Sequence, residues 1–177
     1  VLNQKCVRNG EIELDAIKYG SPLNTNKEHC YLQLNDILIN SMGVGTLGRI
    51  SRNLSIKSKM IIHNCITFVR ADESKVKQSF LYYSLKRNQI YFEQLGIGAT
   101  GQTSLKIDII KGKEVIVPKQ NLLNEFDKLV NPIWKEIGFL KNKNHNLQQT
   151  RDHLLPKLIS GKVDVSDLDI DTSILDD

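Results

Sequence analysis

The sequence has little of what several classes of protein depend on. Its three cysteines, at positions 6, 30 and 65, are an odd count and are not accompanied by a close pair of Cys or His residues, so neither a disulfide framework nor a zinc site is expected. No apolar run approaches the roughly 18 residues needed to cross a bilayer, so we expect no membrane association. We therefore expect free thiols in a reducing cytoplasm, with no metal or other cofactor. Because the chain begins with Val1 and not Met, we expect a fragment or a processed chain.

The sequence shows none of the arrangements of catalytic side chains that catalysis requires. No Ser/His/Asp, Cys/His or paired-carboxylate arrangement is recognisable, so we predict no catalytic residue. Residues 43–48 (GVGTLG) match a dinucleotide-binding pattern, but neither a helical stripe nor a suitably placed acidic residue follows. A glycine-rich turn between strands is the better interpretation. The pattern of the whole chain favours a binding module.

Charge is distributed unevenly along the 177 residues, whose net charge is +4. Residues 1–113 hold 16 Lys and Arg against 9 Asp and Glu, whereas residues 164–177 hold six Asp and no base. A basic body has the sign needed to bind a polyanion such as DNA, although an ordinary solvated surface gives the same count. We predict an acidic tail over residues 163–177 rather than a calcium loop, because Thr172 stands where such a loop needs glycine.

The first part of the chain mixes strand and helix signals. Residues 37–39, 61–69 and 113–117 are rich in β-branched side chains and predict strands. Residues 76–95 carry apolar side chains near helical spacing and end at a glycine, which predicts a helix. Residues 96–103 (GIGATGQT) predict a loop, after which Ser104 would cap a short helical turn.

The second part carries a seam of period 3.5 from about residue 122 onward, typical of a coiled coil. We predict one long helix over residues 119–162, kinked near Pro132 because proline lacks an N–H and clashes with the preceding turn. The alternative is a helix packed on its own domain. The helix-pairing positions are Phe126, Val130, Ile133, Ile137, Leu140, Asn144, Leu147, Arg151, Leu154 and Leu158.

The predicted fold is therefore α+β. A mixed-strand domain, incomplete at its N-terminal end, would cover residues 1–118 and be followed by the long coiled-coil-type helix. A single helix cannot form a coiled coil. Its partner would be a second copy of the chain, another subunit, or a missing part of the same polypeptide.

Three stretches of the sequence resemble the specificity subunits of type I restriction-modification systems. They are residues 98–106 (GATGQTSLK), 115–118 (VIVP) and 151–162 (RDHLLPKLISGK), and the last looks like the end of the long conserved helix of that family. Residues 1–15 and 34–49 also resemble a target-recognition domain. The resemblance extends from residue 1 to about residue 168.

This resemblance implies a function and a set of partners. The family's whole subunit has two target-recognition domains, each followed by a long helix, and the two helices pair antiparallel as a spacer. This chain looks like the second half of such a subunit, or a half-length version. It would bind double-stranded DNA and pair with a second copy or a missing N-terminal half. Methylation subunits would carry the adenine chemistry, and a restriction subunit would carry translocation and cleavage.

Within that hypothesis, basic side chains would hold phosphates and polar loop side chains would contact base edges in the major groove. Two alternatives stay open: a recognition module of another DNA methyltransferase or restriction enzyme, and a coiled-coil interaction protein without a DNA role. The predicted DNA-binding residues are Lys5, Arg8, Arg49, Arg52, Lys57, Gln102, Thr103 and Lys106.

Overall fold

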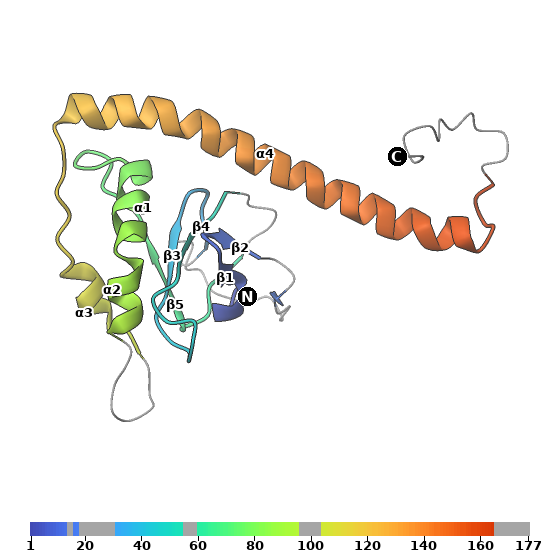
Figure 1. Cartoon of the computed structure of the whole chain (residues 1–177), viewed down its shortest axis with the longest axis horizontal. Helices are drawn as coiled ribbons and strands as arrows, with labels where there is room; N and C mark the ends of the chain where they lie inside the picture. The colour runs from blue at the N-terminus through green and yellow to red at the C-terminus, as the bar shows by residue number, and fades with distance from the viewer. Residues whose placement is uncertain (14–15, 18–30, 55–59, 96–103, 165–177) are drawn as a thin grey trace, which may run out of the picture. The chain divides into compact units, whose positions relative to one another are not determined.

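The computed structural model describes residues 1–13, 16–17, 31–54, 60–95 and 104–164 (Figure 1). The chain divides into two compact units, Val1–Gly138 and Phe139–Asp177. Strands and helices are both present in the first unit, and a long helix follows them in the sequence, which confirms the α+β class. The predicted limits of the domain, the helix and the acidic tail stay predictions.

Within the described residues, the strands form two small antiparallel sheets. A hairpin pairs β1 (Val7–Arg8) with β2 (Glu11–Ile12), just after the short 3₁₀ helix η1 (Gln4–Cys6). In the second sheet, β3 (Ile37–Asn40) lies between β4 (Ile50–Arg52) and β5 (Ile66–Val69). The strand predicted at residues 37–39 is therefore confirmed, and β5 confirms the second half of the one predicted at residues 61–69.

Strand β3 separates two hydrophobic cores. Because side chains alternate across a strand, Ile37 and Ile39 face one core, where Phe92 and Trp134 also lie. Leu38 faces the other core, which the N-terminal segment and the residues before β5 complete. Both faces of β3 are buried, which explains why its residues 37–39 form a continuous apolar run.

Two helices follow β5 where a single one was predicted. Figure 1 shows α1 (Gln78–Arg87) and α2 (Gln89–Gln94) end to end beside the three-stranded sheet. They are divided at Asn88, whose side-chain Nδ2 donates to the carbonyl oxygen of Ser84 at 2.8 Å. Asparagine competes with the helix for backbone groups in this way, so the break is a local effect of that residue.

The loop predicted at residues 96–103 lies outside the described residues, and two local predictions after it are wrong. Helix α3 (Ile107–Lys111) is preceded by Lys106 as its N-cap, whereas Ser104 forms an isolated bridge with Met42. Residues 113–117 form no strand, and Ile116 is 93% exposed. β-Branched side chains favour a strand where they pack against neighbouring residues and are buried. Their presence alone did not produce a strand here.

The long helix α4 spans Gln120–Ile159. It runs through Pro132 without interruption, so no new helix starts there, and the predicted kink stays a prediction. Within the first unit, α4 buries Leu123, Trp134 and Gly138. A Cβ atom on Gly138 would lie 2.6 Å from the carbonyl oxygen of Leu54, so glycine permits close contact between α4 and the segment after β4. This part of the helix therefore packs on its own domain.

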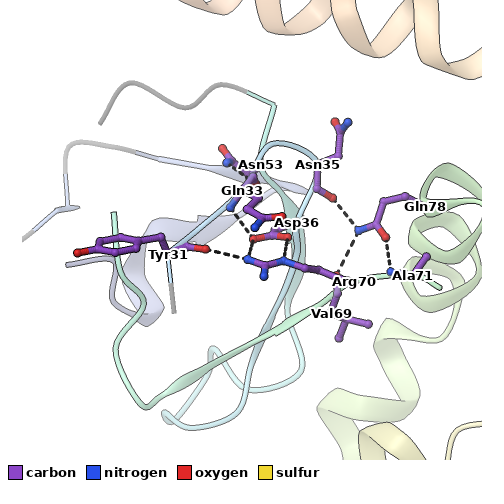
Figure 2. Close-up of polar contacts among 9 residues, drawn as sticks. All are labelled: Tyr31, Gln33, Asn35, Asp36, Asn53, Val69, Arg70, Ala71 and Gln78. Atoms are coloured by element: carbon purple, nitrogen blue, oxygen red, sulfur yellow. Dashed lines mark hydrogen bonds and ion pairs between the residues drawn. The ribbon is translucent and has the colours of Figure 1, made fainter. Parts of the chain in front are cut away.

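A buried ion pair stabilises one end of the three-stranded sheet (Figure 2). Asp36 precedes β3 and is 2% exposed, and Arg70 follows β5. The Arg70 guanidinium donates from Nε to Asp36 Oδ1 at 2.6 Å and from Nη2 to Oδ2 at 2.8 Å. Its Nη2 also donates to the carbonyl oxygen of Tyr31, and the Gln33 N–H donates to Asp36 Oδ2. Hydrogen bonding to Asp36 raises the pKa of Arg70 above its usual value.

The same end of the sheet is linked to α1 by Gln78. As Figure 2 shows, its Nε2 donates to the carbonyl oxygens of Asn35 and Val69, while its Oε1 accepts from the Ala71 N–H. Asn53, after β4, donates from Nδ2 to the Gln33 carbonyl oxygen at 2.9 Å. All three strands and the first helix are therefore tied together by a side-chain network that satisfies backbone groups at the strand ends.

Candidate nucleic-acid interface

An open cleft of about 750 Å³ in the first unit gathers positive charge. Three segments line it: the β1–β2 hairpin, the start of β4 and the junction of α1 with α2. None of these lining residues is acidic. They are Arg8, Asn9, Gly10, Arg49, Ile50, Lys86 and Gln89.

The hairpin wall of the cleft is built by an Asn-Gly turn. Val7 pairs with Ile12 and Arg8 pairs with Glu11, which leaves Asn9 and Gly10 as a two-residue connection. Both have positive φ, at 52° and 81°, as a type I′ turn requires. The turn places Arg8 at the edge of the cleft, with its side chain about half exposed and 3.9 Å from Glu13.

The β4 wall of the cleft depends on the glycine-rich turn between β3 and β4. Gly43, Gly45 and Gly48 all have positive φ, and the turn joins two paired strands, which confirms the interpretation of residues 43–48 as an inter-strand turn. Arg49 donates from Nη2 to the Gly45 carbonyl oxygen at 2.7 Å. A Cβ atom on Gly48 would lie 2.4 Å from the backbone nitrogen of Glu93, so glycine allows the turn to contact α2 directly.

The helical wall of the cleft presents Lys86. Its Nζ donates to the Ile50 carbonyl oxygen at 3.0 Å and to Gln89 Oε1 at 2.5 Å. Gln89 Oε1 also accepts from the Ile50 N–H, and its Nε2 donates to Glu93. Burial lowers the pKa of Lys86, because a low-dielectric environment disfavours the charged form. A partly desolvated ammonium attracts an incoming anion more strongly than a fully hydrated one does.

The predicted DNA-binding residues fall into different places. Arg8 and Arg49 meet in the cleft. Lys5 is exposed on η1 and lines a separate cavity with Asn3, Gln4 and His63, and Lys106 is exposed at the start of α3. Lys57, Gln102 and Thr103 lie outside the described residues.

Arg52 lies in the core of the first unit and is 6% exposed. Its guanidinium carbon is 3.3 Å from the ring centroid of Trp134 and 4.8 Å from that of Tyr82. Burial lowers the pKa of Arg52 to about 10, so the side chain keeps its charge at neutral pH. Its environment is thus the junction of β4, α1 and α4 rather than solvent.

Five lining residues were absent from the prediction: Asn9, Gly10, Ile50, Lys86 and Gln89. The dipeptide Asn9-Gly10 is a strong hairpin signal, and its position beside Arg8 would have identified the turn. Lys86 gave no comparable signal, because a single cation on a helix is common and the contact with Ile50 is not local in sequence.

The predicted helix-pairing residues divide at the boundary between the two units. In the first unit, Phe126 contacts the rings of Phe80 and Tyr83, and Val130 packs against the core, whereas Ile133 is exposed. Ile137 is half-buried. In the second unit, the exposed positions of the seam are Leu140, Asn144, Leu147, Arg151, Leu154 and Leu158.

The part of the chain that the structure describes forms neither a cluster of metal ligands nor a membrane-spanning helix. There, no three His, Cys, Asp or Glu side chains come together as ligands of a metal ion would. Among the same residues, no helix is both long enough and apolar enough to cross a membrane. Cys6 and Cys65 are free and buried.

Comparison with known proteins connects part of this chain with one family. Over 92 residues, 52% of the chain, it is 32% identical to the type I restriction enzyme MjaIX specificity subunit of Methanocaldococcus jannaschii. Over 86 residues, 48% of the chain, it is 31% identical to the type I restriction enzyme HindI specificity subunit of Haemophilus influenzae. No family model matches the chain.

These alignments cover 21% and 19% of the two relatives, so the matched region is about a fifth of either curated protein. Part of this chain is therefore similar to part of a type I specificity subunit, which confirms the resemblance inferred from the sequence. The activity and the partners of a whole subunit belong to the proposal that follows.

Proposed function

We propose that this chain recognises double-stranded DNA as a type I specificity subunit or half-subunit. It would direct adenine methylation and restriction that partner subunits carry out, and would itself be non-catalytic. The similarity to two specificity subunits carries the proposal. Free thiols at Cys6 and Cys65 suit the cytoplasmic location that belongs to the same proposal.

In this proposal, the cleft is where the first unit holds the DNA backbone. Arg8, Arg49 and Lys86 approach it from three different segments, and none of the described residues that line it is acidic. A guanidinium binds phosphate through parallel N–H donors, and an ammonium binds it as a point charge. Such contacts set the position of the protein on the duplex, while residues elsewhere distinguish the bases. Gln102, which lies outside the described residues, remains our candidate for an adenine contact.

The test is selection from a randomised duplex pool, using the chain with its neighbouring methylation subunits over a series of salt concentrations. Enrichment of a short split motif supports sequence recognition. Arg49→Ala is expected to weaken binding to all sequences and to reduce the salt slope by about 0.9 for the lost phosphate contact. Gln102→Ala is expected to relax one base position. Binding that is absent, or independent of salt, would favour the alternative of a coiled-coil interaction protein.

A matched pair of variants tests the cleft itself. Lys86 lines the cleft, whereas the next residue, Arg87, is exposed and does not. Lys86→Met should weaken DNA binding, and Arg87→Met should change it little. Equal losses would mean that only the total charge of the protein matters and that the cleft has no particular role.

We propose further that the exposed seam of the second unit pairs with another helix. The partner would be a second copy or the missing half of a full-length subunit, and the paired helices would set the spacing of a bipartite target. Inserting seven residues after Asn144 preserves the heptad phase and adds about 10 Å of helix. That length corresponds to roughly three base pairs. An unchanged gap in the selected motif would refute the idea of a helical spacer.

A further inference from the structure

Arg52 is a buried cation that lies against two aromatic rings. It ends β4 with its guanidinium carbon 3.3 Å from the Trp134 ring centroid, and Tyr82 lies on a second side. The two rings are 5.7 Å apart, centroid to centroid, and nearly perpendicular at 86°. Glu11, on β2, adds a favourable charge interaction. Arg52 Nη1 is buried and has no hydrogen-bond partner among the described residues.

If Arg52 served only to stabilise the fold, burying its charge would be an unfavourable choice. Removing a guanidinium from water is only partly offset by cation–π contacts. An apolar side chain of similar size often stabilises a buried site at least as well as a buried charge does. The position of Arg52 within the fold therefore bears on its role.

The backbone of Arg52 contacts the hairpin turn that lines the cleft. Its backbone N–H donates to the Gly10 carbonyl oxygen at 3.3 Å, and Tyr82 Oη donates to the same oxygen at 3.4 Å. Gly10 belongs to the turn that carries Arg8 into the cleft. The Arg52 guanidinium therefore packs against Tyr82, and both β4, through the Arg52 N–H, and the Tyr82 hydroxyl contact the Gly10 carbonyl oxygen of this turn.

The aromatic side of this arrangement is itself fixed. Trp134 is 3% exposed, and its Nε1 donates to Tyr83 Oη at 3.3 Å. Tyr82 and Tyr83 are neighbours on α1, with ring centroids 5.1 Å apart. The guanidinium therefore packs against a rigid aromatic surface provided by two helices.

We propose that Arg52 is a positioning residue for the cleft: packed against Trp134 and Tyr82, it holds the Asn9–Gly10 turn so that Arg8 lines the same cleft as Arg49. This role rests on the proposed DNA recognition. Arg52 touches no phosphate and acts through the backbone of Gly10. Its planar group is required, because an ammonium has no plane to stack on a ring.

The experiment measures binding of the full chain to a fluorescent duplex of random sequence by anisotropy over a salt series. Arg52→Met is expected to weaken binding roughly tenfold with an unchanged salt slope, because no phosphate contact is lost. Arg49→Ala, the comparison, should reduce that slope. Arg52→Lys is expected not to restore binding. Trp134→Leu should match Arg52→Met without adding to it in the double variant, whereas Trp134→Phe should restore most of the affinity.

Hydrogen exchange provides a readout that does not depend on DNA. In Arg52→Met, the amides of residues 7–13 should exchange faster, while those of β5 should be unchanged. Exchange that rises equally everywhere would indicate general destabilisation and overturn the proposal.

Two further outcomes would also overturn it. A reduced salt slope in Arg52→Met would make Arg52 a phosphate contact, and full recovery in Arg52→Lys would mean that charge alone matters. If the wild-type chain does not bind DNA, the proposed function fails. Faster exchange confined to the hairpin would then still show that Arg52 holds the turn, so the two failures are distinguishable.

Discussion

Removing Arg70 should be more harmful than neutralising its partner Asp36. The Asp36 carboxylate is almost fully buried, whereas the Arg70 side chain is 30% exposed and can turn toward water. Arg70→Met leaves a buried carboxylate with the Gln33 N–H and no cation (Figure 2). Asp36→Asn removes the charge from the buried site and leaves the arginine access to solvent. The two substitutions therefore differ in which group is left uncompensated.

The magnitude follows from the geometry of the pair. Breaking a fully buried ion pair by removing one partner costs about 3–5 kcal/mol. Because water can reach the Arg70 side of this pair, we expect a smaller loss of about 2–3 kcal/mol for Arg70→Met. For Asp36→Asn we expect about 1–2 kcal/mol, because the amide oxygen can still accept from one side while the amide nitrogen cannot accept, so at least one hydrogen bond from Arg70 is lost. The double variant should cost less than the sum of the two, because the cation and the anion depend on each other.

The single tryptophan makes this measurement specific for the first unit. Trp134 is the chain's only Trp and is buried in the first unit, so its fluorescence reports the unfolding of that unit in urea. Lys75→Met is the control, because Lys75 pairs with Asp72 on the surface and its loss should leave the midpoint unchanged. A loss for Arg70→Met that is smaller than that for Asp36→Asn would refute the reasoning from burial.

Three further substitutions have defined outcomes. Lys86→Arg should preserve DNA binding at alkaline pH. The wild type should lose affinity before pH 10.5, because burial lowers the pKa of Lys86, and anisotropy titrations against pH measure this difference. Gly48→Ala should destabilise the first unit by about 2 kcal/mol or more, since φ is +73° and the new Cβ would meet the Glu93 backbone; loss of Trp fluorescence in urea measures it. Leu147→Lys should abolish association through the seam, because it places a charge among apolar side chains, while Leu147→Met should leave association intact. Sedimentation of each variant, alone or with its partner half, measures the association.

The sequence predicted elements whose signals are local. The β-branched run at β3, the helical spacing after β5 and the glycines at 43–48 each act within a few residues, and each prediction was confirmed in type. The strand predicted at residues 113–117 was wrong because strand propensity depends on burial and on a neighbouring strand. In the helix, the seam pattern identified apolar positions but not their partners. Phe126 and Val130 therefore looked like pairing residues although they pack on their own domain.

The candidate site could be predicted from the sequence only where the type and local context of a residue indicate DNA binding. Arg8 and Arg49 were predicted, and the cleft brings them together. Lys86 and the environment of Arg52 required the tertiary structure, because the contacts of Lys86 with Ile50 and of Arg52 with Trp134 join distant segments. Periodicity reports which face of an element is apolar, but it does not report which cation faces a ring.

Strand β3 has a consequence for anyone who wishes to redesign this protein. Because Ile37 and Ile39 belong to one core and Leu38 to the other, no residue of its apolar run is available for variation without repacking a hydrophobic layer. The hairpin tip at Asn9 and the turn before Arg49 carry cleft residues outside that strand. A library that retargets the surface should therefore randomise the side chains on these two turns, retain the glycines whose φ is positive, and leave β3 untouched.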